Sequence, residues 1–399
     1  MNMCTIYYNI ARREWYQCEE PKGLLFGKED TILTYVAGRQ NNSLPFPVNR
    51  DGNRVGPLIG ILTAPSSDNT FIGNLQNLKS IVLALQDRGA LGIIITPHSL
   101  QEHPVQCFTF YKPLMKWIKL EVPLPTTVYN RIPYRPIEET QLFNAVVSFL
   151  KMKGIPFFNP YFFSKWNVYQ ILKRNQSLIS FLPETILLTQ LSDLESMLIK
   201  HQDIYLKRAS GSKGIGIYRL KKERNKIIVE TPNGKQIYRT LASFWEKNDE
   251  EFAQEDFILQ KAIPYDTYDG KRYDLRLLCH YDYDSTGHSI SGIGVRLSGE
   301  SEVTTHVPNG GTIIPYERVR PRFDEALLNR LVYIIGKELN KQIEEFVGEF
   351  SIDLGRSVDG GLFIYEINSK PMVFDETHIR KKGLENLTKL LIMKATITT

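Results

Sequence analysis

Hydrophobic and polar residues alternate along the first part of the chain with the periods of strands and helices. The pattern predicts an apolar strand at 58–65, an amphipathic helix at 73–90 and a second strand at 91–97. Strand, helix and strand at this spacing are typical of a parallel βαβ crossover. We therefore expect residues 1–115 to form an N-terminal α/β domain.

The next segment has a different character. Residues 112–136 are rich in proline and predict an extended connection, whereas 137–154 and 163–175 have the apolar spacing of helices. A short strand is predicted at 155–160. We take 116–160 as a segment that connects the N-terminal domain to the rest of the chain.

From about residue 180 the pattern changes to short strands separated by turns. The hairpin at 226–240 turns at Asn233-Gly234, which is a strong hairpin signal. Further strands are predicted at 182–189, 203–222 (two strands), 257–264, 273–283, 291–298 and 349–371 (two strands), with helices at 191–201 and 323–343. The pattern predicts an α/β (α+β) protein whose second part, 161–390, consists mostly of short strands and antiparallel hairpins.

Composition and charge narrow the classes of protein to consider. The 399 residues are 42% hydrophobic and 23% charged, which is enough apolar material for a packed core. The net charge of +5 is mild and forms no basic stripe, so we expect no nucleic-acid partner. The four cysteines have no zinc-type or redox spacing, and neither a signal peptide nor a membrane span is apparent. We expect a cytoplasmic protein.

An unusual strand near the C-terminus carries the first chemical signal. In IYEINSKP (364–371), Glu366 and Asn368 share one strand face, and a turn at Asp359-Gly360-Gly361 would bring Asp353 near them. Burying carboxylates is costly unless a cation compensates them. Two carboxylates and an amide oxygen suit Mg²⁺ beside nucleotide phosphates. The alternative is a solvated hairpin with a few charges.

A glycine-rich loop gives the second signal. In LKRASGSKGIGI (206–217) a strand ends at Lys207, and serines and glycines follow before the next strand. Glycines allow backbone N–H groups to approach phosphate oxygens, and serines can add donors. The loop is neither a P-loop nor a dinucleotide fingerprint, because GxxxxGK[ST] is absent and a strand follows it. An ordinary turn is an equally good explanation of this stretch alone.

Arginines on two predicted strands give the third signal. Asp274 and Arg276 lie two residues apart on one strand face, and Arg296 could come from the neighbouring strand. A guanidinium suits bidentate binding of a carboxylate or a phosphate. Taken alone, a cross-strand salt bridge explains these residues better.

The order of these signals gives a family resemblance. SKW, YLKRASGSKGIGI, ILQKAIP, SIDLG and YEINSKP occur in the order and spacing of the ATP-grasp superfamily, over about residues 160–385. VYNRIPYR and FNPYFFSKW extend the resemblance to nearly the whole chain, to the YheC/YheD family of endospore coat-associated proteins. It implies an N-terminal pre-ATP-grasp-like domain and two lobes with mostly antiparallel sheets, a lid lobe at about 182–262 and a C-terminal lobe at about 263–390.

The resemblance also implies roles for the matching positions. Nucleotide contacts would come from Lys165, Lys207, Ser210, Gly211, Ser212, Gly214, Gly216, Gln260, Lys261 and Ile263. Mg²⁺ would be bound by Asp353, Glu366 and Asn368, with two ions expected and Mn²⁺ as an acceptable substitute. Arg276 and Arg296 would stabilise the transferred phosphoryl group or a substrate carboxylate. The hinge carries Lys261 where the family often has an acid, and Asp266 is a guess for the ribose contact.

The implied reaction is ligation. ATP would activate a carboxylate as an acyl phosphate, which an amine then attacks, in sporulation or spore coat formation. The expected partners are ATP, an unidentified carboxylate and amine, and spore coat proteins with which the chain would associate. Two alternatives stay open: a non-catalytic ATP-binding coat protein, and a small-molecule kinase on the same fold.

Overall fold

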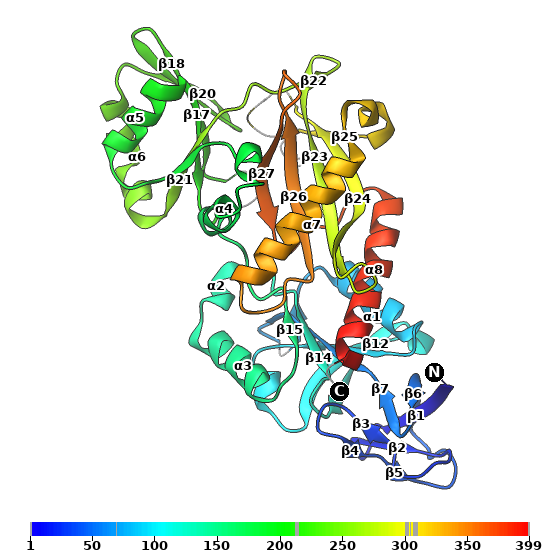
Figure 1. Ribbon diagram of the computed structural model, residues 1–399. Helices are drawn as coiled ribbons and strands as arrows, with labels where there is room; N and C mark the ends of the chain where they lie inside the picture. Colours follow the sequence, from blue (N-terminus) through cyan, green and yellow to red (C-terminus); the bar gives the residue numbers. More distant parts are fainter. Residues whose placement is uncertain are drawn as a thin grey trace.

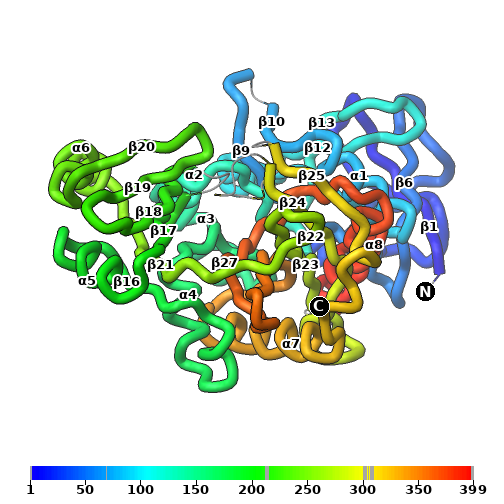
Figure 2. Tube along the Cα trace, turned by 90° about the horizontal axis from the view of Figure 1, so that it is seen from above, coloured from blue at the N-terminus to red at the C-terminus, as the bar shows by residue number. Residues whose placement is uncertain are grey.

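The computed structural model describes residues 2–68, 70–211, 215–299, 303, 305 and 310–397. Figure 1 shows three regions: the N-terminal sheets at the bottom, a sheet with two helices at the upper left, and a long-stranded sheet at the upper right. Viewed from above, the upper-left sheet and the N-terminal strands lie on opposite sides of the long-stranded sheet (Figure 2).

Residues 2–56 form a β-sheet that we did not predict from the hydrophobic pattern. Trp15 is at its centre, with ring centroids about 5 Å from those of Tyr8, Phe26 and Phe46. Strands of two residues, such as β3 and β4, show no alternation from which they could be predicted, whereas the alternation of β1 was overlooked. The seven strands are β1 (Asn2–Asn9), β2 (Glu14–Gln17), β3 (Leu25–Phe26), β4 (Thr31–Ile32), β5 (Thr34–Tyr35), β6 (Ser43–Asp51) and β7 (Arg54–Gly56).

The predicted βαβ crossover is confirmed in the next sheet. Strands β8 (Leu58–Leu62) and β11 (Leu91–Ile95) pair in parallel, joined by α1 (Leu75–Gln86). The segment predicted as an extended connection contributes strands β13 and β14 to the same sheet. The remaining elements are β9 (Ala64–Pro65), β10 (Phe71–Ile72), β12 (Val105–Tyr111), β13 (Lys116–Val122), β14 (Thr127–Asn130), β15 (Phe157–Phe158), α2 (Arg135–Glu138) and α3 (Gln141–Met152).

The sheet formed by residues 185–261 consists of six antiparallel strands with one apolar face, and we call it the lid sheet after the lobe that the resemblance implies. Leu206 and Leu259 pack with residues of α5 and α6 on that face. Because strand side chains alternate, Lys207 and Gln260 lie on the opposite face. The elements are β16 (Thr185–Leu188), α5 (Leu191–His201), β17 (Asp203–Arg208), β18 (Ile217–Glu223), β19 (Lys226–Thr231), β20 (Gly234–Tyr238), α6 (Leu241–Gln254) and β21 (Phe257–Lys261).

The C-terminal sheet, in the order β25-β24-β23-β26-β27, has an apolar face and a polar face. Leu275 and Ile352 pack with Leu328 and Ile335 of α7 on the apolar face. The last helix, α8, was not predicted; it packs against β23, β24 and α1. The elements are α4 (Lys165–Lys173), β22 (Thr267–Tyr268), β23 (Lys271–Asp282), β24 (Gly287–Leu297), β25 (Thr312–Ile314), α7 (Glu325–Gln342), β26 (Glu349–Arg356), β27 (Leu362–Asn368) and α8 (Thr377–Ile397).

Candidate functional site

The predicted charged residues form a row across the polar face of the C-terminal sheet. Arg276 of β23 is paired with Asp353 of β26, which is paired in turn with Glu366 of β27. Asn368 follows two residues later on β27, opposite Ser351. The register brings these side chains to one face because their neighbours in sequence, such as Ile352 and Ile367, belong to the core on the other face.

A buried ionic network lies at one end of this row. Arg296 makes a bidentate pair with Asp274, at 2.9 and 3.0 Å, and its Nη2 lies 3.1 Å from Asp353 Oδ2. Burial favours the neutral form of Arg296, but the two carboxylates outweigh this and raise its pKa. The cross-strand salt bridge is therefore present. It holds Arg296 in place beside Asp353.

Arg276 is less well satisfied than Arg296. Its Nε is buried without a hydrogen bond in the described part of the chain, and its ion pair with Asp353 Oδ1 is long, at 3.9 Å. Burial is the main cause of a lowered pKa for Arg276, although Asp353 acts in the opposite direction. A buried guanidinium in this state gains most from an added anion.

The start of helix α4 contacts both the sheet and the glycine-rich loop. Lys165, the first residue of α4, lies with its Nζ 3.2 Å from Glu366 Oε1 and donates to the carbonyl oxygen of Gly211. The backbone N–H of Lys165 donates to the carbonyl of Ala209 at 2.8 Å. Lys165 therefore links the loop that follows β17 to the carboxylate row.

Lys207 is a half-buried lysine on the polar face of the lid sheet. Its Nζ donates to Gln260 Oε1 at 2.7 Å and lies 5.9 Å from the ring centroid of Tyr365 on β27. Burial lowers the pKa of Lys207 to about 7; Glu366 opposes the shift, while Lys165 and Arg272 reinforce it. An anion at this point would restore its charge.

The glycine-rich loop is described only in part, since Ser212 and Gly214 lie outside the described residues. Ser210 is exposed and Gly211 is partly buried. Gly216 has a φ of +65°, and a Cβ at this position would meet the side chain of Arg208 at 2.5 Å. Glycine is therefore required at 216 both by the backbone conformation and by the available space.

The predicted hinge follows β21. Gln260 accepts from Lys207 and donates to Thr185, while Lys261 is exposed and Ile263 is buried. The backbone N–H of Lys261 donates to the carbonyl of Glu184, within the lid sheet. That N–H is therefore occupied, and an adenine contact from this hinge stays a prediction.

Sequence analysis missed Arg272, which joins the two sheets. Its Nη1 donates to Tyr205 of β17 at 2.7 Å, and its guanidinium lies 5.3 to 5.7 Å from the ring centroids of Tyr205, Tyr265 and Tyr365. The signal was available, because Arg272 precedes Asp274 by two residues and shares its strand face.

Asp266, the guess for a ribose contact, already accepts from three side chains and from the backbone N–H of Thr267. It accepts from Tyr273 at 2.9 Å, from Arg322 at 3.0 Å and from Arg356 at 2.8 Å. Its role toward a nucleotide stays a prediction.

We define the intersheet site as the region where the lid sheet and the C-terminal sheet meet. Its basic residues outnumber its acidic ones, which is the charge balance that an anionic ligand requires. The members are Lys165, Lys207, Arg272, Arg276, Arg296, Asp274, Asp353, Glu366 and Asn368.

The donor set fits a hard divalent cation bound together with phosphates. Within the described ranges, no cluster of three or more His, Cys, Asp or Glu side chains forms a metal site by itself. Asp353 and Glu366 lie opposite each other, and Asn368 shares their sheet face. Two carboxylates and an amide fit Mg²⁺ that takes its other ligands from phosphates and water. The two acids are now paired with Arg296 and Lys165.

Two antiparallel sheets that meet around these groups define the class: the chain has the ATP-grasp fold. It resembles the D-alanyl-alanine synthetase A of Vibrio cholerae, with a TM-score of 0.52 and 14% sequence identity, covering 86% of this chain and 98% of that one. The model of a YheC/D-like ATP-grasp family matches residues 154–397, and the chain belongs to that family.

Two relatives come from Bacillus subtilis (strain 168). The endospore coat-associated protein YheD is 28% identical over 352 residues, covering 84% of this chain and 77% of that protein. The endospore coat-associated protein YheC is 24% identical over 297 residues, covering 69% of this chain and 78% of that protein. None of the helices among the described residues has the length and apolar character needed to cross a bilayer.

Proposed function

We propose that the chain is an Mg-ATP-dependent ligase of the ATP-grasp type. It activates a carboxylate as an acyl phosphate, and an amine then forms the amide. The observation that carries the proposal is the excess of basic over acidic side chains in the intersheet site. Lys207, with its pKa lowered to about 7, and Arg276, with a buried Nε that lacks a hydrogen bond among the described residues, both favour an anion between the sheets.

Each step of the reaction has residues suited to it. A carboxylate oxygen of the substrate attacks the γ-phosphorus of ATP, and ADP leaves. Lys165 and Lys207 would bind the phosphate oxygens, and Arg276 would stabilise the negative charge on the transferred group. The amine then attacks the acyl carbon, phosphate leaves, and the amine loses a proton.

The metal would be bound by Asp353, Glu366 and Asn368. Mg²⁺ at this position would neutralise phosphate charge. Lys165 would then exchange its pairing with Glu366 for a contact with the nucleotide. Ser210, Gly211 and Gly216 belong to the loop that we expect to exclude water from the acyl phosphate.

The experiment is product analysis after incubation of the purified protein with ATP, Mg²⁺ and an extract of sporulating cells. We expect ADP, phosphate and a new amide, detected by mass spectrometry, in amounts that match one another. ADP together with a phosphorylated product would instead identify a kinase. Neither ADP nor a new product would contradict the ligase.

A second candidate function is favoured by the names of the relatives. YheD and YheC are both described as endospore coat-associated. The chain would then bind Mg-ATP without turnover and take part in assembly of the spore coat. Tight, saturable nucleotide binding with no turnover in the extract would favour this candidate over the ligase.

A further inference from the structure

A second polar region lies on the C-terminal sheet, beyond the intersheet site, next to a cavity of about 600 Å³. The cavity lies between α1 and β14 on one side and α8 with the loop after β27 on the other, and its size is typical of a site for a small molecule. The residues that matter for the argument are Arg131, Leu278, Glu349, Phe374, Arg380 and Lys381, all of which line it.

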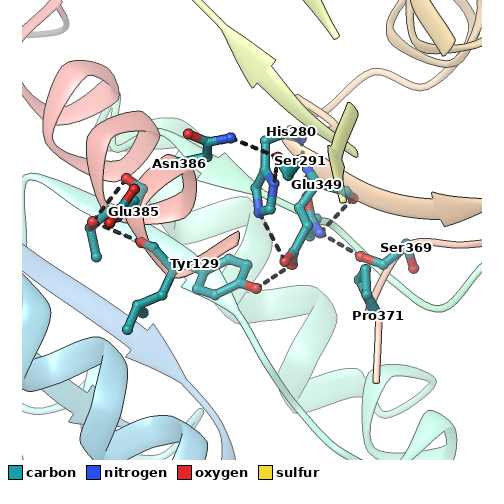
Figure 3. Close-up of polar contacts among 12 residues, drawn as sticks. Tyr129, His280, Ser291, Glu349, Ser369, Pro371, Glu385 and Asn386 are labelled. Atoms are coloured by element: carbon teal, nitrogen blue, oxygen red, sulfur yellow. Dashed lines mark hydrogen bonds and ion pairs between the residues drawn. The ribbon is translucent and has the colours of Figure 1, made fainter. Parts of the chain in front are cut away.

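Among the described residues that line this cavity, Glu349 is the only acid, and basic groups already balance its charge. Glu349 accepts from Tyr129 at 2.5 Å and lies 3.2 Å from His280 Nε2 (Figure 3). Arg131 Nη1 lies 3.7 Å from Glu349 Oε2. Burial alone would raise the pKa of Glu349, but these three partners outweigh burial and lower it. Glu349 therefore stays ionised and balances one of the cations of the cavity.

The remaining charge of the lining is positive. Arg380 donates to Thr377 Oγ1 at 3.1 Å and weakly to the carbonyl of Phe374, and no carboxylate pairs with it in the described part of the chain. Lys381 is exposed beside it. With Arg131 balanced by Glu349, Arg380 and Lys381 leave two positive charges in excess. The first turn of α1 also lines the cavity, and the positive end of its dipole adds to this field.

The cavity is next to the intersheet site. Phe374 lines the cavity, and its ring centroid lies 5.2 Å from Cζ of Arg276. Leu278 follows Arg276 by two residues on β23, and Glu349 precedes Asp353 by four on β26, so the cavity extends from the charged row along one sheet face. With a rise of about 3.3 Å per residue, Leu278 lies about 7 Å from Arg276 along β23, and Glu349 lies about 13 Å from Asp353 along β26. A molecule of several carbon atoms can span these distances.

We infer that this cavity binds a substrate that carries a carboxylate in addition to its reacting group. The extra carboxylate pairs with Arg380 and Lys381, the apolar part packs on Leu278 and Phe374, and the reacting end points to Arg276. One part of this inference rests on the proposed function, namely that the reacting end of the substrate points toward Arg276. It narrows the substrate to dicarboxylates or carboxylate-bearing amines.

The test uses the whole chain labelled with ¹³C at the methyl groups of methionine and isoleucine. Met372 and Ile81 line the cavity, whereas Ile258 and Ile263 lie at the lid sheet and hinge. The probes are N-acetyl-L-glutamate, N-acetyl-L-glutamine and N-acetyl-L-glutamine amide, which carry two, one and no carboxylates. We expect saturable shifts of Met372 and Ile81, with an affinity that falls along this series.

Arg380→Gln should weaken binding of N-acetyl-L-glutamate about tenfold, the loss typical of one charge-assisted hydrogen bond. Arg330→Gln, an exposed arginine of α7, is the matched control and should bind as the wild type does. Equal shifts with the uncharged amide, no saturable shift with any probe, or unchanged affinity in Arg380→Gln would overturn the inference. In a separate titration, Mg-ATP is added to the same labelled protein. If the methyl signals of Ile258 and Ile263 do not shift, that result counts against the proposed function but not against this inference.

Discussion

Asp353 and Glu366 lie directly opposite each other on β26 and β27, and each is paired with a different cation. Arg296 Nη2 is 3.1 Å from Asp353 Oδ2, and Lys165 Nζ is 3.2 Å from Glu366 Oε1. Basic residues of β24 and α4 thus balance the charge of this pair. We propose that a metal bound with a nucleotide takes over part of this pairing.

The network around Arg296 makes a prediction about stability. Arg296→Met leaves Asp274 and Asp353 nearly buried without their guanidinium, which should lower the free energy of unfolding by about 3–5 kcal/mol. Arg320→Met is the control, because Arg320 makes a similar bidentate pair with Glu325 at the surface, and it should cost less than about 1 kcal/mol. Urea denaturation measures both values. Equal costs would show that burial of the network is unimportant.

The lowered pKa of Lys207 predicts a pH dependence of nucleotide binding. Near pH 8 most Lys207 side chains are neutral, because their pKa is about 7, and a bound triphosphate would favour the charged form. Binding should therefore take up a proton, and affinity should fall by up to about tenfold per pH unit above pH 7. Below about pH 6 the lysine is already charged, and the dependence should vanish. Calorimetry in buffers of different ionisation enthalpy measures the proton uptake.

Lys207→Met should abolish that uptake, whereas Lys222→Met, at an exposed position on β18, should keep it. The lowered pKa of Lys207 also makes the stability of the ligand-free protein depend on pH. The unfolded chain holds a proton that Lys207 of the folded protein has released between about pH 7 and 10, so the free energy of unfolding should rise with pH in this window. Uptake that persists in Lys207→Met would assign the proton to another group.

The glycine-rich loop gives a prediction about backbone conformation. Gly216→Ala should destabilise the protein by more than about 1 kcal/mol and weaken ATP binding, because φ is +65° and the new methyl group would meet Arg208. Gly154→Ala is the matched control: its φ of +59° is close to that of Gly216, but nothing lies within 4 Å of the added Cβ. It should cost less stability and leave ATP affinity unchanged. Thermal unfolding and ATP titration of both variants provide the comparison, and identical behaviour would exclude the Arg208 contact as a cause.

The sequence was most informative where a residue's role depends on strand alternation. Alternation alone placed Glu366 with Asn368 and Asp274 with Arg276, and the registers of β23, β26 and β27 confirm these placements. Arg272 was available from the same rule and was overlooked.

Other features depend on contacts between segments far apart in the chain. Tyr129 and Glu349 are 220 residues apart, so no local pattern could predict their hydrogen bond or the cavity beside them. Parts of the N-terminal sheet were missed because strands such as β3 and β4 have only two residues, but β1 has eight residues with a visible alternation and was overlooked. Helix α8 was missed for a different reason: it packs on the polar sheet face and on α1, so its sequence lacks a single apolar stripe.

The central claim is that the intersheet site binds Mg-ATP through Asp353 and Glu366. The most direct test is calorimetric titration of ATP, with and without Mg²⁺, into the wild type, Glu366→Gln and the exposed control Glu317→Gln. We predict saturable, Mg²⁺-dependent binding to the wild type and to Glu317→Gln, and at least tenfold weaker binding to a Glu366→Gln variant with an unchanged circular dichroism spectrum. Equal affinity for all three proteins, or no binding to the wild type, would contradict the claim.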